Sequence, residues 1–244
     1  MFKPELVLSN TTSFFIGGLK AAFVNAKRYG FKYLEIIPYR GSTSGEILNW
    51  QKIYGIRVVG VHLPNTSWQA TWLEEIKNTT SLWTKFWYPV FHAYLNNASQ
   101  NPGLDIISAL ETRPYLVIHS DIADQMGDKF QKISKNFHVV VENIPGDIKL
   151  FPGGVFDHGH FNETRQELAE LNLSELYRKS RPEIIHISYN SLFNHLLPNR
   201  QEQEELKQLL KIHTPKYIVI ETNPLVSIKK GKHMLEKIIN EALG

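Results

Sequence analysis

The stretch that decides the fold is residues 115–142, YLVIHSDIADQMGDKFQKISKNFHVVVE, in which two apolar runs flank a polar segment. The runs Tyr115–Ile118 and Phe137–Val141 lack the polar alternation of a strand with one face in water, so they indicate parallel strands covered on both faces. Between them, Asp121–Lys135 has the pattern of a helix. A strand, a helix and a strand in this order predict a βαβ unit.

The same unit recurs along the chain. Six further apolar runs, rich in Val, Ile, Tyr and Phe, are Leu6–Leu8, Tyr33–Ile37, Arg57–Val61, Gly154–Phe156, Ile184–Ile187 and Tyr217–Ile220. Further helix-like segments are Phe14–Tyr29, Ser44–Tyr54, Thr71–Asn97, Leu104–Thr112, Asn162–Ser180, Gln201–His213 and Ser227–Leu243. Eight strands in 244 residues fit an α/β protein with a single (β/α)8 TIM barrel, whose usual length is about 250 residues. We therefore expect one domain over residues 1–244.

One connection of this barrel is irregular. Only Asn143–Gly153 separates the fifth apolar run from the sixth, and this link contains Pro145 and Pro152 together with glycine. Proline interrupts a helix because it lacks a backbone N–H and its ring clashes with the preceding turn. We expect the fifth helix to be irregular or missing.

Composition excludes several classes of function. The chain has no cysteine, so disulfides, thiolate metal sites and cysteine nucleophiles are ruled out, and any metal must bind nitrogen and oxygen ligands. The net charge of +3 is too small to indicate a nucleic-acid-binding surface by itself. No apolar stretch has the length of a membrane span, and Met1–Asn10 lacks the pattern of a secretory signal. We expect a cytoplasmic protein without a membrane partner.

A chemically active residue lies at or near the end of each of six successive strands. In chain order they are His62, His119, Glu142, Asp157 with His160, His186 and Glu221, and His195 follows the seventh strand. The C-terminal ends of barrel strands converge on one face, so these side chains should share a small volume. Clustered carboxylates repel one another unless a positive charge compensates them, which a divalent cation does. Mixed histidine and carboxylate ligands suit Zn, Mn, Fe or Co.

This ordered series resembles the xylose isomerase-like superfamily of TIM barrels, which includes endonuclease IV and the sugar epimerases related to tagatose epimerase. The resemblance rests on several short motifs over most of the chain. They are H-x-P at His62, the strand-end His119, E-N at Glu142 and Asn143, D-x-x-H at Asp157 and His160, His186 with the following His195, and Glu221.

The epimerase branch implies one metal held by Glu142, Asp157, His186 and Glu221. The resemblance further implies that Glu142 and Glu221 are catalytic. One removes a proton from a carbon next to a carbonyl, the other returns it, and the metal stabilises the enediolate as a Lewis acid. His160 would contact oxygens of a small, sugar-like substrate.

The endonuclease IV branch implies zinc-dependent cleavage of a phosphodiester beside an abasic site, and only this alternative makes DNA a partner. It uses nine ligands for three zinc ions, and the chain offers eight counterparts. Where the ninth, an Asp two residues before His195, is expected, the chain has Phe193. His62, His119, His160 and His195 therefore remain candidates either for further metal binding or for substrate contact.

A third alternative is a barrel that binds a metal or ligand without catalysis. It is kept open by the shortened fifth unit and by the lack of a clear counterpart to the substrate-binding arginine of the epimerases, for which Arg200 is out of register. Glu35, Trp68 and Asn143 follow or end strands and are assigned to the substrate pocket. The residue pattern leaves the oligomeric state open.

Overall fold

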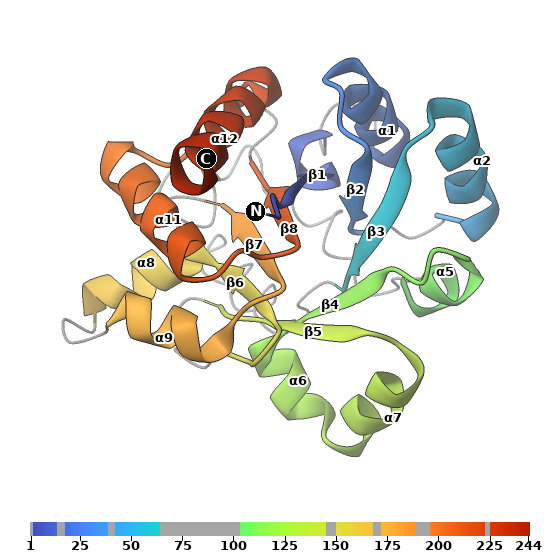
Figure 1. Ribbon diagram of the computed structural model, residues 1–244. Helices are drawn as coiled ribbons and strands as arrows, with labels where there is room; N and C mark the ends of the chain where they lie inside the picture. Colours follow the sequence, from blue (N-terminus) through green and yellow to red (C-terminus); the bar gives the residue numbers. More distant parts are fainter. Residues whose placement is uncertain are drawn as a thin grey trace, which may run out of the picture.

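Eight parallel strands close into a barrel in the order β1 to β8, with a ring of helices outside it (Figure 1). The computed structural model describes residues 2–13, 18–38, 42–63, 103–144, 150–167, 172–188, 196–222 and 225–244. The strands are β1 (Glu5–Ser9), β2 (Tyr33–Ile36), β3 (Arg57–His62), β4 (Tyr115–His119), β5 (Val139–Glu142), β6 (Val155–Asp157), β7 (Ile184–Ile187) and β8 (Tyr217–Ile220). The predicted TIM-barrel fold is confirmed. The assignment of all residues to one domain stays a prediction.

The helices follow the strands in sequence and cover the outer face of the barrel. After the 3-10 turn η1 (Asn10–Ser13), the described helices are α1 (Gly18–Arg28), α2 (Ser44–Tyr54), α5 (Gly103–Ala109), α6 (Ser120–Met126), α7 (Asp128–Asn136), α8 (His158–Glu167), α9 (Leu173–Ser180), α11 (Arg200–Ile212) and α12 (Ile228–Leu243). In the link between β5 and β6, the described residues 143–144 and 150–154 contain no helix. The helix expected at Thr71–Asn97 lies outside the described residues.

Two predicted helices differ from the structure. The single helix expected at Asp121–Lys135 is two helices, α6 and α7, because Gly127 between them has φ 47° and ψ −122°, a conformation that no helix contains. The segment expected as one helix at Asn162–Ser180 is described as α8 and α9, and α8 begins four residues earlier, at His158. The remaining described helices match their predicted segments closely.

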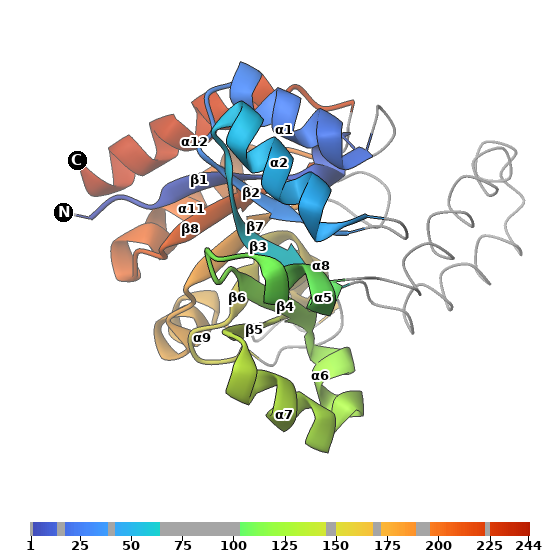
Figure 2. The same ribbon diagram turned by 90° about the vertical axis from the view of Figure 1, so that its right-hand side faces the viewer.

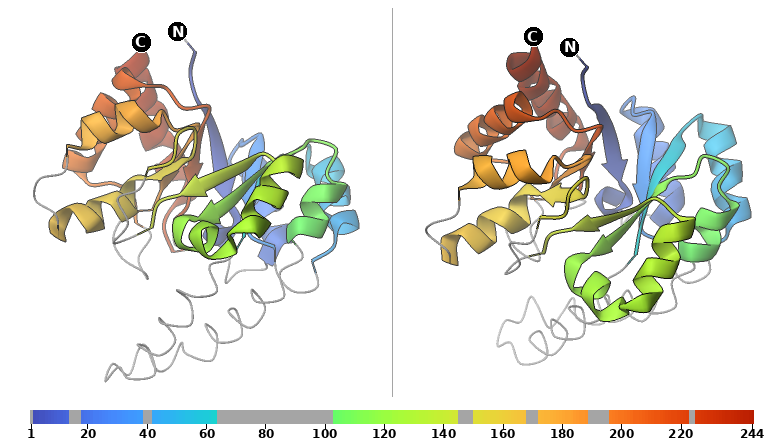
Figure 3. Two further views of the ribbon diagram at one scale, coloured as in Figure 1. Left: turned by 90° about the horizontal axis from the view of Figure 1, so that it is seen from below. Right: turned by 60° about the horizontal axis from the view of Figure 1, so that its bottom comes forward.

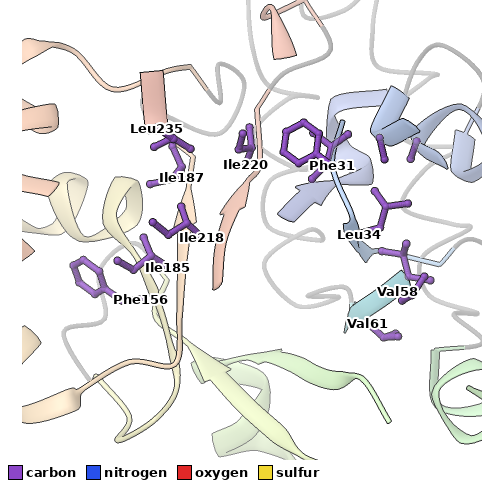
Figure 4. Close-up of a cluster of buried hydrophobic side chains, with 14 of the residues drawn as sticks. Phe31, Leu34, Val58, Val61, Phe156, Ile185, Ile187, Ile218, Ile220 and Leu235 are labelled. Carbon is purple, nitrogen blue, oxygen red and sulfur yellow. The ribbon is translucent and has the colours of Figure 1, made fainter. Parts of the chain in front are cut away.

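The outer faces of the strands form the larger apolar core. Because side chains alternate across a strand, every second residue points toward the helices. Figure 4 shows Ile185 and Ile187 of β7 and Ile218 and Ile220 of β8 in this layer, and Leu235 of α12 packs in the same cluster. All five are buried. Burying an aliphatic side chain of this size contributes about 1.5–3 kcal/mol, so this layer fixes the helices against the barrel.

The inner faces form a second, smaller apolar cluster inside the barrel. Its buried members are Val7, Val59, Tyr115, Val117, Val140, Val155, Ile184 and Val219, with Tyr33 and Tyr217 packed against them. The Tyr115 ring lies in the space that a side chain at Gly60 of β3 would fill. These apolar side chains fill much of the interior, so we expect a polar site mainly at the C-terminal ends of the strands.

Gly60→Ala should destabilise the protein by about 1–3 kcal/mol, the usual cost of overpacking a core. A Cβ at this position would lie 2.3 Å from Cε2 and 2.5 Å from Cζ of the buried Tyr115 ring. Urea unfolding followed by circular dichroism measures the effect. Gly45→Ala is the matched control, because a Cβ there meets nothing within 4 Å. If both variants unfold at the wild-type urea concentration, the packing described for Gly60 is wrong.

The two ends of the chain lie at the same end of the barrel (Figures 2 and 3). The Lys3 ammonium, just before β1, donates a hydrogen bond of 2.9 Å to the side-chain oxygen of Asn240 in α12. This end is the one at which the strands begin. Among the described residues, no helix is both long enough and apolar enough to cross a membrane.

Candidate metal centre

The C-terminal ends of the strands bring the predicted site residues together. Glu142, Asp157, His186 and Glu221 each offer one ligand atom, and these four atoms lie within 4.8 Å of one another. All four residues are buried. Within the described part of the chain, His62, His119 and Glu142 form a second group that meets the same criterion. The two groups share Glu142, so its carboxylate is the centre of the arrangement.

Glu142 ends β5 and contacts three imidazoles. His62 Nε2 donates to Oε2 at 2.8 Å and His186 Nδ1 donates to Oε1 at 3.1 Å. His119, paired with Glu142 in the β4–β5 register, has its Nε2 3.6 Å from Oε2. Burial would raise the pKa of Glu142, but the charge and hydrogen bond of His186, together with those of His62, hold the pKa well below its usual range. The carboxylate is therefore ionised at neutral pH.

His186 lies in the middle of β7 among three carboxylates. Its Nδ1 is 3.1 Å from Glu142 Oε1 and 3.1 Å from Glu221 Oε2, and its Nε2 is 3.2 Å from Glu35 Oε2. Burial alone would lower the pKa of His186, but the charges of Glu142 and Glu35 and the hydrogen bonds raise it well above its usual value. In the metal-free protein, a protonated His186 thus supplies positive charge where a metal would otherwise supply it.

Asp157 is held at the end of β6 by several hydrogen bonds. Its backbone N–H donates to Asn143 Oδ1 at 2.8 Å, and its carbonyl accepts from Asn143 Nδ2 at 3.0 Å. The carboxylate accepts from the Ser188 hydroxyl and, at 2.7 Å, from the backbone N–H of His160. Because β5 and β6 pair only through Glu142 and Val155, Asn143 takes over the role of the strand ladder here. Burial raises the pKa of Asp157.

His160 lies one helical turn beyond Asp157, beside the four-residue group. Its Nδ1 donates to the backbone carbonyl of Asn143 at 3.0 Å and lies 3.8 Å from Asp157 Oδ2. Burial would lower the pKa of His160, but the charges of Asp157 and Glu142 raise it. The hydrogen bond to a carbonyl fixes the orientation of the ring.

His62 and His119 lie edge to face, with ring centroids 4.9 Å apart and planes at 86°. His62 Nδ1 donates to the carbonyl of Leu63 at 2.8 Å. Burial would lower the pKa of His62, but the hydrogen bond and charge of Glu142 raise it to about 9. Burial lowers the pKa of His119 to about 4, despite the attraction of Glu142. The pair thus consists of one charged and one neutral imidazole at neutral pH.

These two shifts predict that the metal-free protein is most stable near pH 6.5. Above this pH the unfolded chain loses a proton that folded His62 keeps, so the free energy of unfolding falls by about 3 kcal/mol by pH 9 from this group alone. Below pH 6.5, His119 is protonated in the unfolded chain but stays neutral in the folded chain until about pH 4. The free energy of unfolding therefore falls again as the pH decreases. Urea unfolding in the presence of a chelator measures the profile.

Two variants test the assignment of the limbs of this profile. His62→Gln should reduce the loss of stability above pH 6.5 without abolishing it, because the raised pKa of His186 contributes to the same loss. His119→Gln should remove the loss of stability below pH 6.5. A wild-type profile in either variant would contradict the corresponding assignment.

The other predicted residues have different positions. Glu35 is fully buried next to His186, and the Asn143 amide bonds the backbone of Asp157. Their assignment to the substrate pocket stays a prediction. Trp68 and His195 lie outside the described residues. His158, next to Asp157 in sequence, contacts Glu205 of α11 at 3.3 Å, on the side of β6 away from the centre.

Sequence reasoning missed Ser188, whose hydroxyl donates to the Asp157 carboxylate. Ser188 follows His186 by two residues, so strand alternation places it on the same inner face and could have identified it.

Comparison with known proteins supports the fold. No family model and no curated protein matches the sequence. The solved structures that match include three that are similar over nearly the whole chain. AP endonuclease, family 2, from Brucella melitensis has a TM-score of 0.60 at 14% identity, covering 96% of this chain and 98% of that chain. The IolI protein with a bound zinc atom has a TM-score of 0.59 at 12% identity, covering 98% and 99%.

The third structure is a putative uncharacterised protein from Parabacteroides distasonis, with a TM-score of 0.56 at 11% identity, covering 98% of both chains. Identities this low establish a common fold and no more. Together with the closed barrel of eight parallel strands, these likenesses show that the chain has the fold of the xylose isomerase-like TIM barrels, as its strand-end motifs predict.

Proposed function

We propose that the chain is a metal-dependent isomerase or epimerase that moves a proton on a carbon next to the carbonyl of a small, sugar-like substrate. The observation that carries the proposal is the group of Glu142, Asp157, His186 and Glu221, whose ligand atoms lie within 4.8 Å of one another. Three buried carboxylates and one imidazole are a donor set that suits Zn, Mn, Fe or Co. The zinc atom of IolI, a protein of the same fold, agrees with this choice.

In this proposal, some of the site residues bind the metal or the substrate, and others transfer the proton. When bound, the metal would act as a Lewis acid on the substrate carbonyl. Glu142 and Glu221 come from strands on opposite sides of β6 and β7 and both reach the centre, so one carboxylate can accept the proton and the other can return it. His160, with its ring fixed by the carbonyl of Asn143, is placed to contact substrate oxygens. Asp157, held by Ser188 and Asn143, is a ligand only.

The direct test is proton exchange with solvent. Protein loaded with Zn, Mn, Fe or Co is incubated in deuterated water with a panel of ketoses and aldoses, and deuterium at the carbon next to the carbonyl is followed by NMR. Exchange in at least one combination, absent after chelation, is expected. A metal-loaded protein that exchanges no substrate of the panel would favour the non-catalytic barrel instead.

A second candidate is a phosphodiesterase of the endonuclease IV type, favoured by the adjoining group of His62, His119 and Glu142. The similarity to an AP endonuclease fold agrees with it. This function requires two or three metal ions per chain, cleavage of a duplex that contains an abasic site, and DNA binding that weakens steeply with salt. One metal per chain by elemental analysis, with no cleavage, would exclude it.

A further inference from the structure

Glu35 is a buried carboxylate that the proposed reaction does not use. It lies in β2 with no exposed surface, and Oε2 is 3.2 Å from Nε2 of His186, which is equally buried. Its neighbours in the strand register are Ser9 on one side and Gly60, which has no side chain, on the other. Within the part of the chain that the structure describes, Glu35 Oε1 has no hydrogen-bond partner. The polar neighbours of the carboxylate are therefore His186 and the Tyr115 hydroxyl.

The two nitrogens of the His186 ring face different groups. Nε2 faces Glu35, whereas Nδ1 lies 3.1 Å from Glu142 Oε1 and 3.1 Å from Glu221 Oε2, inside the four-residue group. A histidine binds a metal through a nitrogen that carries no proton, so the remaining proton of the neutral ring must be on the other nitrogen. If Nδ1 is the ligand atom, this proton is on Nε2, opposite Glu35.

We propose that Glu35 is a positioning residue for the metal centre: it accepts the Nε2 proton of His186 and so keeps the Nδ1 lone pair directed at the ligand group. The inference rests on the proposed metal-dependent function and assigns Glu35 to the support of a ligand rather than to the substrate pocket. Carboxylates commonly hold the second nitrogen of a metal-binding histidine in this way, and their loss typically weakens metal binding 10- to 100-fold.

The surroundings of Glu35 argue against a purely structural role. Burial raises the pKa of Tyr115, and the charge of the neighbouring Glu35 raises it further. Tyr115 and the valines of the inner cluster surround this level of the barrel with apolar surface. A carboxyl group in such a place is costly to bury unless it has a polar partner, and an apolar side chain would fill the same space at a lower free-energy cost. The contact with His186 supplies the polar partner that offsets the cost of burying this carboxyl group.

Zinc affinity and the tautomer of His186 test the inference. Zinc binding to wild type, Glu35→Gln and Glu35→Leu is measured by competition with a chromophoric chelator. Glu35→Leu should bind zinc 10- to 100-fold more weakly. Glu35→Gln should lose less, because its amide oxygen can still accept the proton. Long-range nitrogen–proton NMR spectra of the zinc-bound wild type should show the His186 proton on Nε2.

Tyr115→Phe is the matched control. It removes a buried hydroxyl beside the same carboxylate without touching His186, so it should keep the wild-type zinc affinity within about 2-fold while the Glu35 variants do not. Urea unfolding of the metal-free variants separates folding from binding. If Glu35→Leu does not fold, the zinc affinity of Glu35→Gln decides, since an affinity below that of the wild type supports the role and an equal affinity overturns it.

The outcomes separate this inference from the function on which it rests. A wild type that binds no zinc would overturn both. A wild type that binds zinc, together with Glu35→Leu of equal affinity or a His186 proton on Nδ1, would overturn the role of Glu35 and leave the metal centre intact.

Discussion

Replacing Glu142 by Gln should abolish zinc binding and proton exchange together, with a loss of exchange rate of at least about 10³-fold. Glu142 is the residue that the two ligand groups share, and its oxygens contact His62 and His186. Glutamine has the same shape, but it lacks the charge that holds a cation and cannot accept a proton from carbon. Elemental analysis and deuterium exchange measure the two effects on the same sample.

The control for this variant is Glu183→Gln. Glu183 is a half-exposed carboxylate that pairs with His138 at 3.5 Å, outside both ligand groups, so the same change of charge should leave zinc content and exchange at wild-type levels. Wild-type zinc content in Glu142→Gln would show that the shared carboxylate is not a ligand. Wild-type exchange would show that Glu142 is not the base.

Adding zinc to the metal-free protein should raise its free energy of unfolding by about 2.7 kcal/mol at a free concentration 100-fold above the dissociation constant. The four ligand atoms come from residues in or directly after four different strands, so the unfolded chain does not present them together. The stabilisation should disappear in Asp157→Asn, because an amide oxygen replaces one charged ligand. Thermal unfolding over a zinc titration, with and without a chelator, measures it.

His158→Gln is the matched control for the zinc titration. His158 is adjacent to Asp157 and equally buried, but it contacts Glu205 on the outside of the barrel. The variant should therefore be destabilised without zinc yet gain as much from zinc as the wild type. If it loses the gain too, the response to zinc reflects general damage to β6 rather than the loss of a ligand.

The strands could be predicted from the sequence because short, continuous apolar runs fit parallel strands that are buried on both faces. Each predicted run overlaps its strand, and the ends differ by a residue or two, as for β5, which begins at Val139 rather than Phe137. The break between α6 and α7 was missed because Gly127, within a helix-like pattern, adopts a conformation that only the folded backbone reveals. Glycine alone does not indicate which of its conformations it takes.

The site could be predicted in part for a related reason. A barrel brings strand ends together, so Glu142, Asp157, His186 and Glu221 had to share one face once the fold was recognised. The contact between Glu35 and His186 spans 151 residues and crosses the interior, which strand order alone does not specify. The bonds of the Asn143 amide to Asp157 were not predicted, because they depend on where the β5–β6 ladder ends.

The hydrogen bond between Lys3 and Asn240 has a practical consequence for engineering this chain. It places the two ends within reach of each other, on the opposite side of the barrel from the ligand groups. A short peptide could join the two ends, and new ends could be opened elsewhere. The circular permutant would keep the order of the strands around the barrel. Tags or surface attachment at either end would likewise lie at the end of the barrel opposite the ligand groups, which suits immobilised assays.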